Sequence, residues 1–196
     1  EMQRSLVGSE MCIRDSFFMF AIVLAALDRS GSVLPILCAM AVHELAHVVM
    51  MLACGGQVRR LTLRFADLQI AASGLGYRQE LLSALAGPLV NLICGAAFCM
   101  QRPSFAAYSL MLGIYNLLPV WPLDGGRMIR CALLARLPIT QAEHISEIVS
   151  FAACAVLLLI GVFLTFFRKS GLWPLGTAAY LTVRLLMLAR RTDAVQ

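Results

Sequence analysis

Charged side chains are scarce in this chain. Only 14% of its 196 residues are Asp, Glu, Lys or Arg, whereas 60% are hydrophobic. A soluble domain is nearer half apolar and a quarter charged, so this composition excludes an ordinary soluble protein and indicates a polytopic membrane protein. A net charge of +5 would suggest nucleic acid binding in a soluble protein. Here the arginines lie between apolar runs, where they anchor helix ends, so no nucleic acid partner is expected.

Cysteine is present but not in a pattern that carries chemistry. The seven cysteines are odd in number, and no two have the C-x-x-C spacing of a thiolate metal site. Most of them lie inside apolar runs, where cysteine behaves as a small hydrophobic residue. The sequence therefore predicts neither a disulfide framework nor a cysteine-based metal site. Histidine is scarcer still: there are only three, and two of them lie four residues apart.

Six apolar runs are predicted to be transmembrane helices, and no internal repeat or soluble domain interrupts them. The runs are residues 17–27, 33–54, 81–100, 104–123, 145–167 and 172–189. The first is too short to cross about 30 Å of hydrocarbon, so it is interpreted as the end of a longer span. The expected fold class is an all-α polytopic membrane protein with about six transmembrane helices and a small membrane-edge β-hairpin.

The predicted domain organisation is one transmembrane domain at residues 17–191, followed by a short tail at 192–196. Residues 1–16 have no periodicity that fits a helix or strand, and we expect them to be a non-native or disordered leader. Residues 124–144 contain Arg127, Arg130 and Arg136 and are predicted to hold an amphipathic or interfacial helix.

The second apolar run contains His43, Glu44 and His47 as its only strongly polar side chains. Residues four apart share a helix face, so both imidazoles can bind one metal ion. Glu44 can reach a water on that metal, and this HExxH pattern is typical of two zinc ligands with a general base. A carboxylate in such a helix costs at least about 2.5–3.5 kcal/mol, which favours a functional role. The alternative is a polar patch that joins helices through hydrogen bonds.

A catalytic zinc usually has three protein ligands, and Asp124 is the best-placed acid for the third. It lies at the end of the fourth apolar run, which returns to the face where the second run ends. Pro119 and Pro122 interrupt that run, and glycines follow Asp124. An unwound segment at membrane depth is tolerated only where it is buried or lines a polar site. The alternatives are a helix N-cap or a partner of Arg127.

Three segments together resemble the signatures of the site-2 proteases, a family of intramembrane zinc metalloproteases known as peptidase family M50. They are His43-Glu44-Leu45-Ala46-His47, Ala86-Gly87-Pro88-Leu89-Val90-Asn91, and Asn116-Leu117-Leu118-Pro119-Val120-Trp121-Pro122-Leu123-Asp124-Gly125-Gly126. Their order and spacing agree with the family, and the resemblance is close over residues 33–136, the expected core of the domain. The predicted spans are most similar to the bacterial sporulation-factor-processing branch.

The resemblance implies hydrolysis of peptide bonds inside the membrane, with Zn²⁺ held by His43, His47 and Asp124 and with Glu44 as general base. It implies that Asn116 binds the substrate backbone or the oxyanion, although an interhelical hydrogen bond is an alternative for this side chain. Asn91 is interpreted as structural. The expected partners are a membrane-spanning or membrane-associated protein substrate, the lipid bilayer and regulatory membrane proteins.

The stretch between the second and third runs is predicted to hold the substrate. Leu61, Leu63 and Phe65 alternate with polar residues, which is the period of a half-buried strand, and residues 68–70 repeat the alternation. A hairpin there would offer a free edge to an extended substrate. The alternative is an interfacial loop whose leucines enter the lipid. If no edge strand forms, the segment with Asn116, Pro119 and Pro122 is expected to hold the substrate instead.

The arginines predict an orientation. Counting loops alternately, one face receives nine Arg or Lys residues and the other four. The positive-inside rule makes the richer face cytoplasmic, which places the predicted site toward the cytoplasmic side of a bacterial cell membrane. Two other functions remain open: an inactive relative that only binds membrane proteins, and a transporter.

Overall fold

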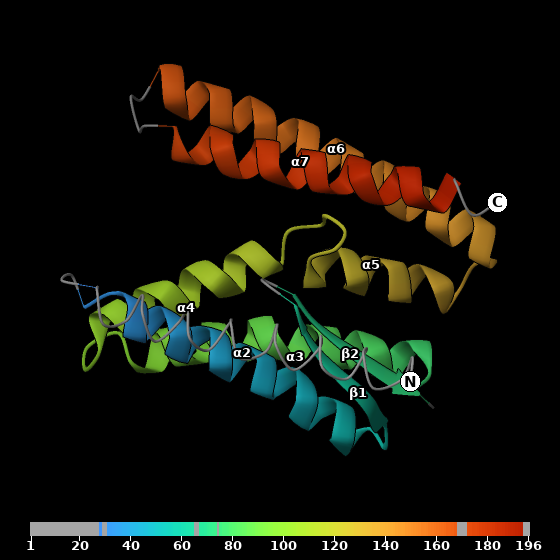
Figure 1. The fold of residues 1–196 in the computed structure, drawn as a ribbon, viewed down its shortest axis with the longest axis horizontal. Helices are drawn as coiled ribbons and strands as arrows, with labels where there is room; N and C mark the ends of the chain where they lie inside the picture. Colours follow the sequence, from blue (N-terminus) through green and yellow to red (C-terminus); the bar gives the residue numbers. More distant parts are fainter. Residues whose placement is uncertain (1–27, 29–30, 65–66, 74, 168–171, 194–196) are drawn as a thin grey trace, which may run out of the picture.

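The computed structural model describes residue 28 and residues 31–64, 67–73, 75–167 and 172–193 (Figure 1). The predicted leader and first span, at residues 1–27, lie outside the described residues. The elements are helices α2 (Val33–Ala53), α3 (Tyr77–Ala97), α4 (Pro103–Asn116), α5 (Asp124–Leu134), α6 (Ile139–Phe166) and α7 (Trp173–Asp193), with strands β1 (Gln57–Arg64) and β2 (Asp67–Ser73).

The helices form two layers with α5 between them (Figure 1). In one layer α2 packs against α3 and α4, and α3 packs against α4. In the other layer α6 and α7 lie side by side. Helix α5 contacts both α3 and α6, so it joins the two layers. Segments far apart in the sequence, namely the second apolar run and the start of α5, are thereby brought together.

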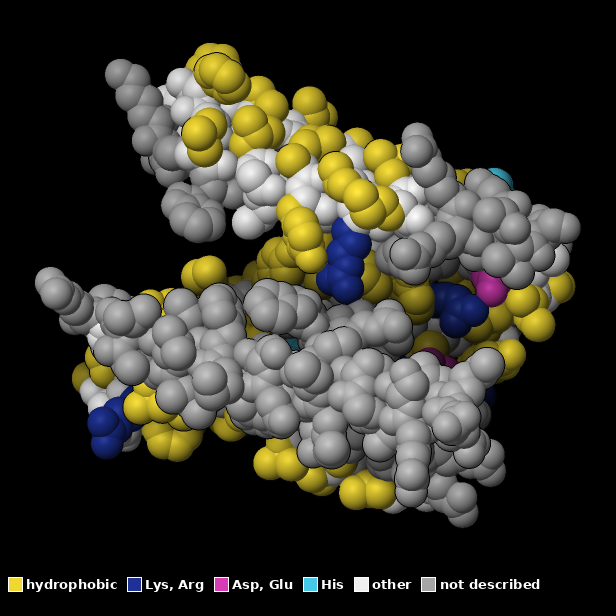
Figure 2. Space-filling view, in the orientation of Figure 1, with side chains coloured by type: hydrophobic (Ala, Val, Ile, Leu, Met, Phe, Trp, Pro, Cys, Tyr) yellow, Lys and Arg dark blue, Asp and Glu magenta, His cyan; other side chains and the backbone are white. Residues whose placement is uncertain are grey.

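Within the described residues, three helices are long and apolar enough to cross a membrane: α2, α3 and α6. Helix α4 has 14 residues and a length of about 21 Å, which is short of about 30 Å of hydrocarbon. Many large apolar side chains face outward, among them Leu159 with 71% of its surface exposed. Figure 2 shows such side chains along the outside of α6 and α7. The molecule is a membrane protein, and the count of six spans stays a prediction.

Several helix boundaries differ from the predicted runs. Helix α4 ends at Asn116 instead of continuing to Leu123, because the prolines that follow cannot sustain helical hydrogen bonds. Helix α3 begins at Tyr77 and α6 begins at Ile139, both several residues before the apolar runs. A search for apolar residues misses such starts, because the first turns of a helix often carry polar side chains. Of residues 124–144, where an interfacial helix is predicted, Asp124–Leu134 form α5 and the residues from Ile139 on belong to α6.

The segment between α2 and α3 contains an antiparallel strand pair. Leu61 pairs with Ile70 and Leu63 pairs with Leu68, and the register shifts between Val58 and Arg60. Both strands extend beyond the alternating segments read from the sequence. Phe65, which belongs to the predicted strand, and the next residue, Ala66, lie outside the described residues. The sheet has only these two strands among the described residues, so each strand has one unpaired edge.

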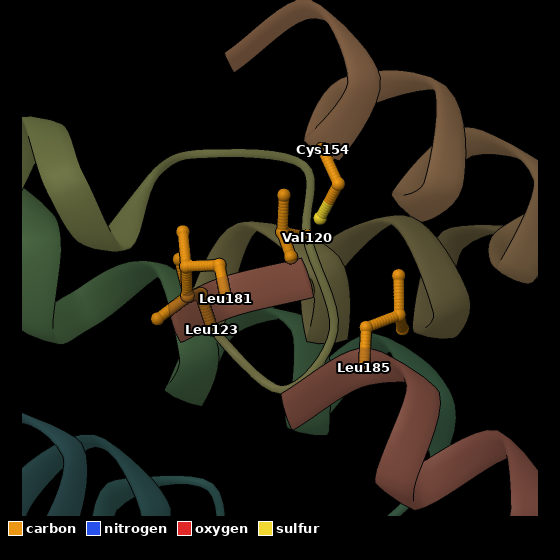
Figure 3. Packing of buried hydrophobic residues seen from close by; sticks show 5 residues of the cluster. All are labelled: Val120, Leu123, Cys154, Leu181 and Leu185. Carbon is orange, nitrogen blue, oxygen red and sulfur yellow. The ribbon is translucent and has the colours of Figure 1, made fainter. Parts of the chain in front are cut away.

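A buried apolar cluster joins α7 to the segment between α4 and α5 (Figure 3). Val120 and Leu123 from that segment meet Cys154 of α6 and Leu181 and Leu185 of α7. All five have at most 9% of their surface exposed. Because Leu123 directly precedes Asp124, this packing determines where α5 begins and where the Asp124 carboxylate lies.

Candidate metal centre

Three buried side chains converge between α2 and α5. The Nε2 atoms of His43 and His47 are 3.1 Å apart, and Asp124 Oδ2 lies 3.0 Å from the first and 3.1 Å from the second. Both histidines come from the same face of α2, as their spacing of four requires. Asp124 is the first residue of α5. The structure therefore brings together the three ligands that were predicted from sequence.

Asp124 uses its two carboxylate oxygens differently. Oδ2 faces both histidines, whereas Oδ1 lies 3.7 Å from Arg127 Nη1, one helical turn further along α5. Burial would raise the pKa of this carboxyl group, but its hydrogen bonds with His43 and His47 outweigh burial and hold the pKa below its usual range. The carboxylate is therefore charged, as a metal ligand must be.

Helix α3 contacts both histidines through the ring nitrogens that do not face Asp124. The Nδ1–H of His47 donates to the Ser83 carbonyl at 2.7 Å, and Asn91 Nδ2 lies 3.2 Å from His43 Nδ1. Gly87 lies between these two contacts, and a Cβ there would collide with the His47 ring. Ser83, Gly87 and Asn91 are spaced four apart, so they share one face of α3, and all three are buried.

The segment before Asp124 turns sharply because two glycines allow its backbone to approach α5. A Cβ at Gly125 would collide with the carbonyls of Leu117 and Leu118, and one at Gly126 with the backbone of Val120 and Trp121. Ser150 of α6 accepts a hydrogen bond from the Trp121 backbone N–H at 3.1 Å. The glycines after Asp124 are thus required by close packing of the unwound segment.

The other predicted site residues lie in different settings. Glu44 is half-buried on α2, directly after His43. Asn116 ends α4 and donates its amide to the Leu112 carbonyl of the same helix, so the structure shows no interhelical bond for it among the described contacts. Pro119 and Pro122 are half-buried in the unwound segment. The backbones of Leu61 and Leu63 lie in β1, while Phe65 lies outside the described residues.

Sequence reasoning missed two contributions from α3. The sequence predicts only a structural role for Asn91, and it predicts no contact between the Ser83 carbonyl and a histidine. A signal for Asn91 was available, since it is a lone amide in an apolar helix and lies four residues after Gly87. No sequence signal identifies Ser83, because its backbone and not its side chain contacts the histidine.

The donor set fits a zinc ion. Two imidazole nitrogens and one carboxylate oxygen, all within 4.8 Å of one another, are ligands that zinc prefers in catalytic sites. Both histidines also have a partner at the other ring nitrogen, as metal-bound histidines almost always do. The three side chains and their contacts therefore define a buried metal centre within a helical membrane protein.

The fold is that of a site-2 protease. The solved structure of the site-2 protease from Methanocaldococcus jannaschii matches with a TM-score of 0.62 at 20% identity, over 87% of this chain and 85% of that one. Residues 102–160 match the sequence model of peptidase family M50. These matches, with the relatives described next, confirm the resemblance that the three motifs indicated.

Two of three similar curated proteins are named zinc metalloproteases, and the third is named a sporulation protein. The chain is 25% identical over 177 residues to zinc metalloprotease MJ0392 of M. jannaschii, covering 80% of this chain and 52% of that protein. It is 27% identical over 164 residues to stage IV sporulation protein FB of Bacillus subtilis, covering 75% and 56%. Putative zinc metalloprotease Rip3 of Mycobacterium tuberculosis is 32% identical over 134 residues, covering 59% and 34%. The chain spans about half the length of the first two relatives.

Proposed function

We propose that this chain is an intramembrane zinc metalloprotease that hydrolyses peptide bonds of membrane-spanning proteins in regulated proteolysis. The observation that carries the proposal is the buried set of His43, His47 and Asp124 with a glutamate directly after the first histidine. Two relatives that are named zinc metalloproteases support the same reaction, and the fold match supports the same architecture.

The proposed chemistry divides between the metal and Glu44. His43, His47 and Asp124 would hold Zn²⁺, which would supply the Lewis acidity that polarises a carbonyl and lowers the pKa of a bound water toward about 7. Glu44 accepts the proton of the attacking water and delivers it to the leaving amine. Asn116 binds the substrate backbone or the oxyanion, for which it has a second amide N–H besides the one donated to the Leu112 carbonyl.

The substrate must be extended at the scissile bond, because a helical peptide bond is hydrogen-bonded and shielded. The unpaired edge of the β1–β2 hairpin, placed at the membrane edge, pairs with the extended substrate in this proposal. The proposal assigns substrate contact to Leu61, Leu63 and Phe65, and it assigns to Pro119 and Pro122 the role of keeping the segment near the metal unwound. The arginine distribution supports a multi-pass protein of the bacterial cell membrane whose site faces the cytoplasm.

The decisive experiment compares wild-type and Glu44→Gln protein. We expect purified wild-type protein to bind one zinc, and Glu44→Gln to bind zinc equally but to lose cleavage, because only the base is removed. His43→Ala should lose both zinc and cleavage. Membrane proteomes of cells that express either form should show uncut single-span proteins only with Glu44→Gln.

Each alternative function predicts a different result. Full proteolysis by Glu44→Gln would refute the proposed mechanism. Capture of membrane proteins without cleavage by the wild type would indicate a binding module. Zinc flux into liposomes without proteolysis would indicate a transporter.

A further inference from the structure

The two histidines of the metal centre are supported by α3 in different ways. For His47 the support is unambiguous: a carbonyl can only accept, so Nδ1 carries the hydrogen that it donates to Ser83, and in the neutral ring Nε2 then has the lone pair that can bind a metal. This is the tautomer that a metal ligand needs. The equivalent position beside His43 is held by the Asn91 amide, which can either donate or accept.

The amide orientation determines the tautomer of His43. With Nδ2 toward His43, the amide donates to Nδ1, and Nε2 then keeps its hydrogen and donates to Asp124 at 3.0 Å. Such a ring cannot bind a metal through Nε2. A half-turn of the amide exchanges nitrogen and oxygen, which are nearly identical in shape. The oxygen would then accept from Nδ1–H, and Nε2 would present its lone pair.

The burial of Asn91 leaves its amide with one described partner in either orientation, so the choice between the two orientations depends on what His43 needs. Asn91 is completely buried, and its Oδ1 has no hydrogen-bond partner among the described residues. Buried amide oxygens are nearly always paired. The half-turn pairs this oxygen with the Nδ1–H of His43 and moves the amide nitrogen to the position without a described partner. It gives His43 the same type of contact that the Ser83 carbonyl provides to His47, and it leaves Nε2 of His43 able to bind a metal.

We propose that Asn91 is a positioning residue for the metal centre, whose amide oxygen accepts the Nδ1–H of His43 and holds that ring as an Nε2 ligand. The inference deepens the proposed function, since it concerns the metal that the protease would use. Gly87, one turn earlier on α3, leaves room for the rings, and Asn91 then orients one of them.

The test measures zinc affinity directly, by competition with a chromophoric chelator on purified protein in detergent. Asn91→Leu should weaken zinc binding about 10- to 100-fold, the usual effect of removing the partner of a metal-bound histidine. Asn91→Asp keeps an acceptor at the same place and should bind zinc at least as tightly as the wild type. Ser109→Ala is the matched control, because Ser109 is also a fully buried polar residue whose hydroxyl has no partner in the described part of the chain.

Folding is checked separately by circular dichroism and size-exclusion chromatography. Wild-type affinity in folded Asn91→Leu would overturn the inference. So would an equal loss in folded Asn91→Leu and Asn91→Asp, because the effect would then come from packing rather than from the acceptor. If Asn91→Leu does not fold, Asn91→Asp decides: tight binding supports the inference, and a loss of more than tenfold overturns it.

These results are separable from the proposed function. A wild type that binds zinc but cleaves nothing would refute the protease proposal and leave the affinity ranking of the Asn91 variants intact. Normal zinc affinity in active Asn91→Leu protein would refute only the role of Asn91.

Discussion

At the scale of single residues, the metal centre satisfies two interpretations of Asp124 at once. The sequence allowed this residue to be either a third ligand or a partner of Arg127. The geometry allows both roles, because Oδ2 faces the histidines while Oδ1 lies near the guanidinium group. The arginine therefore balances charge and orients the carboxylate without competing for the oxygen that faces the site. One side chain can serve both purposes because a carboxylate has two acceptor oxygens.

A substitution at Gly87 tests whether the metal site requires the close approach of α3 to the histidines. In Gly87→Ala the added methyl would overlap the space of the His47 ring and lie within 3.0 Å of His43 as well. We expect zinc content to fall severely while the helical content stays near that of the wild type. Elemental analysis of the dialysed protein measures the first, and circular dichroism the second.

Gly176→Ala is the matched control for that substitution. Gly176 lies in α7, and nothing lies within 4 Å of a Cβ built there, so alanine should leave zinc content unchanged. Full zinc occupancy in Gly87→Ala would show that the rings can move aside, and the close approach of α3 would then not be a requirement of the site.

At the scale of elements, the position of Asp124 depends on where α4 ends. The helix ends at Asn116, an unwound segment follows, and the next helix begins at Asp124. Ser150 holds the unwound backbone from α6, and Val120 and Leu123 anchor it in the apolar cluster of Figure 3. The third ligand is thus positioned by α6 and α7 as well as by its own helix.

The hairpin yields a prediction about substrate binding. Proline lacks an N–H donor, so proline substituted along the pairing edge within residues 61–70 should block cleavage of a membrane-spanning substrate. Zinc content should stay at the wild-type level, because the strands contribute none of the three ligands. Parallel cleavage and zinc assays on the proline series measure both.

The proline series has an internal control in positions whose N–H groups face the partner strand. Those variants should lose stability, whereas variants on the free edge should lose only cleavage. If no proline in the series lowers cleavage, the hairpin does not pair with substrate, and the segment from Asn116 to Pro122 becomes the better candidate.

At the scale of the whole molecule, the orientation in the membrane follows from charge. With nine Arg or Lys residues on one face and four on the other, the loop at Arg59 should lie in the cytoplasm and that at Arg102 outside. Single cysteines placed at these two positions, in a protein without its native cysteines, should react differently with a membrane-impermeant maleimide. From outside intact cells, we expect the probe at position 102 to be labelled and that at 59 to be protected.

Permeabilised cells provide the control for this labelling, since both probes should then react. The opposite pattern in intact cells would invert the orientation and place the metal centre nearer the outer face.

The sequence by itself determined the parts of this protein that depend on local spacing and composition. The apolar runs, the shared face of His43 and His47, and the adjacent Glu44 follow from helical periodicity alone. Asp124 could also be predicted, because two prolines and two glycines mark where a helix must break. The end of α4 was predicted too late, since helix boundaries depend on small differences in free energy that composition does not reveal.

Only the tertiary structure decided how the rings are held. The group of Ser83 that contacts His47 is its backbone carbonyl, which every residue type has, so the residue type at position 83 gives no signal. Asn91 is identified as a partner of His43 only once α3 lies against α2. That packing depends on Gly87, whose missing side chain admits the histidines. Contacts of this kind join residues 36 and 48 positions apart, and no local pattern encodes them, because they arise from the fit between two helix faces.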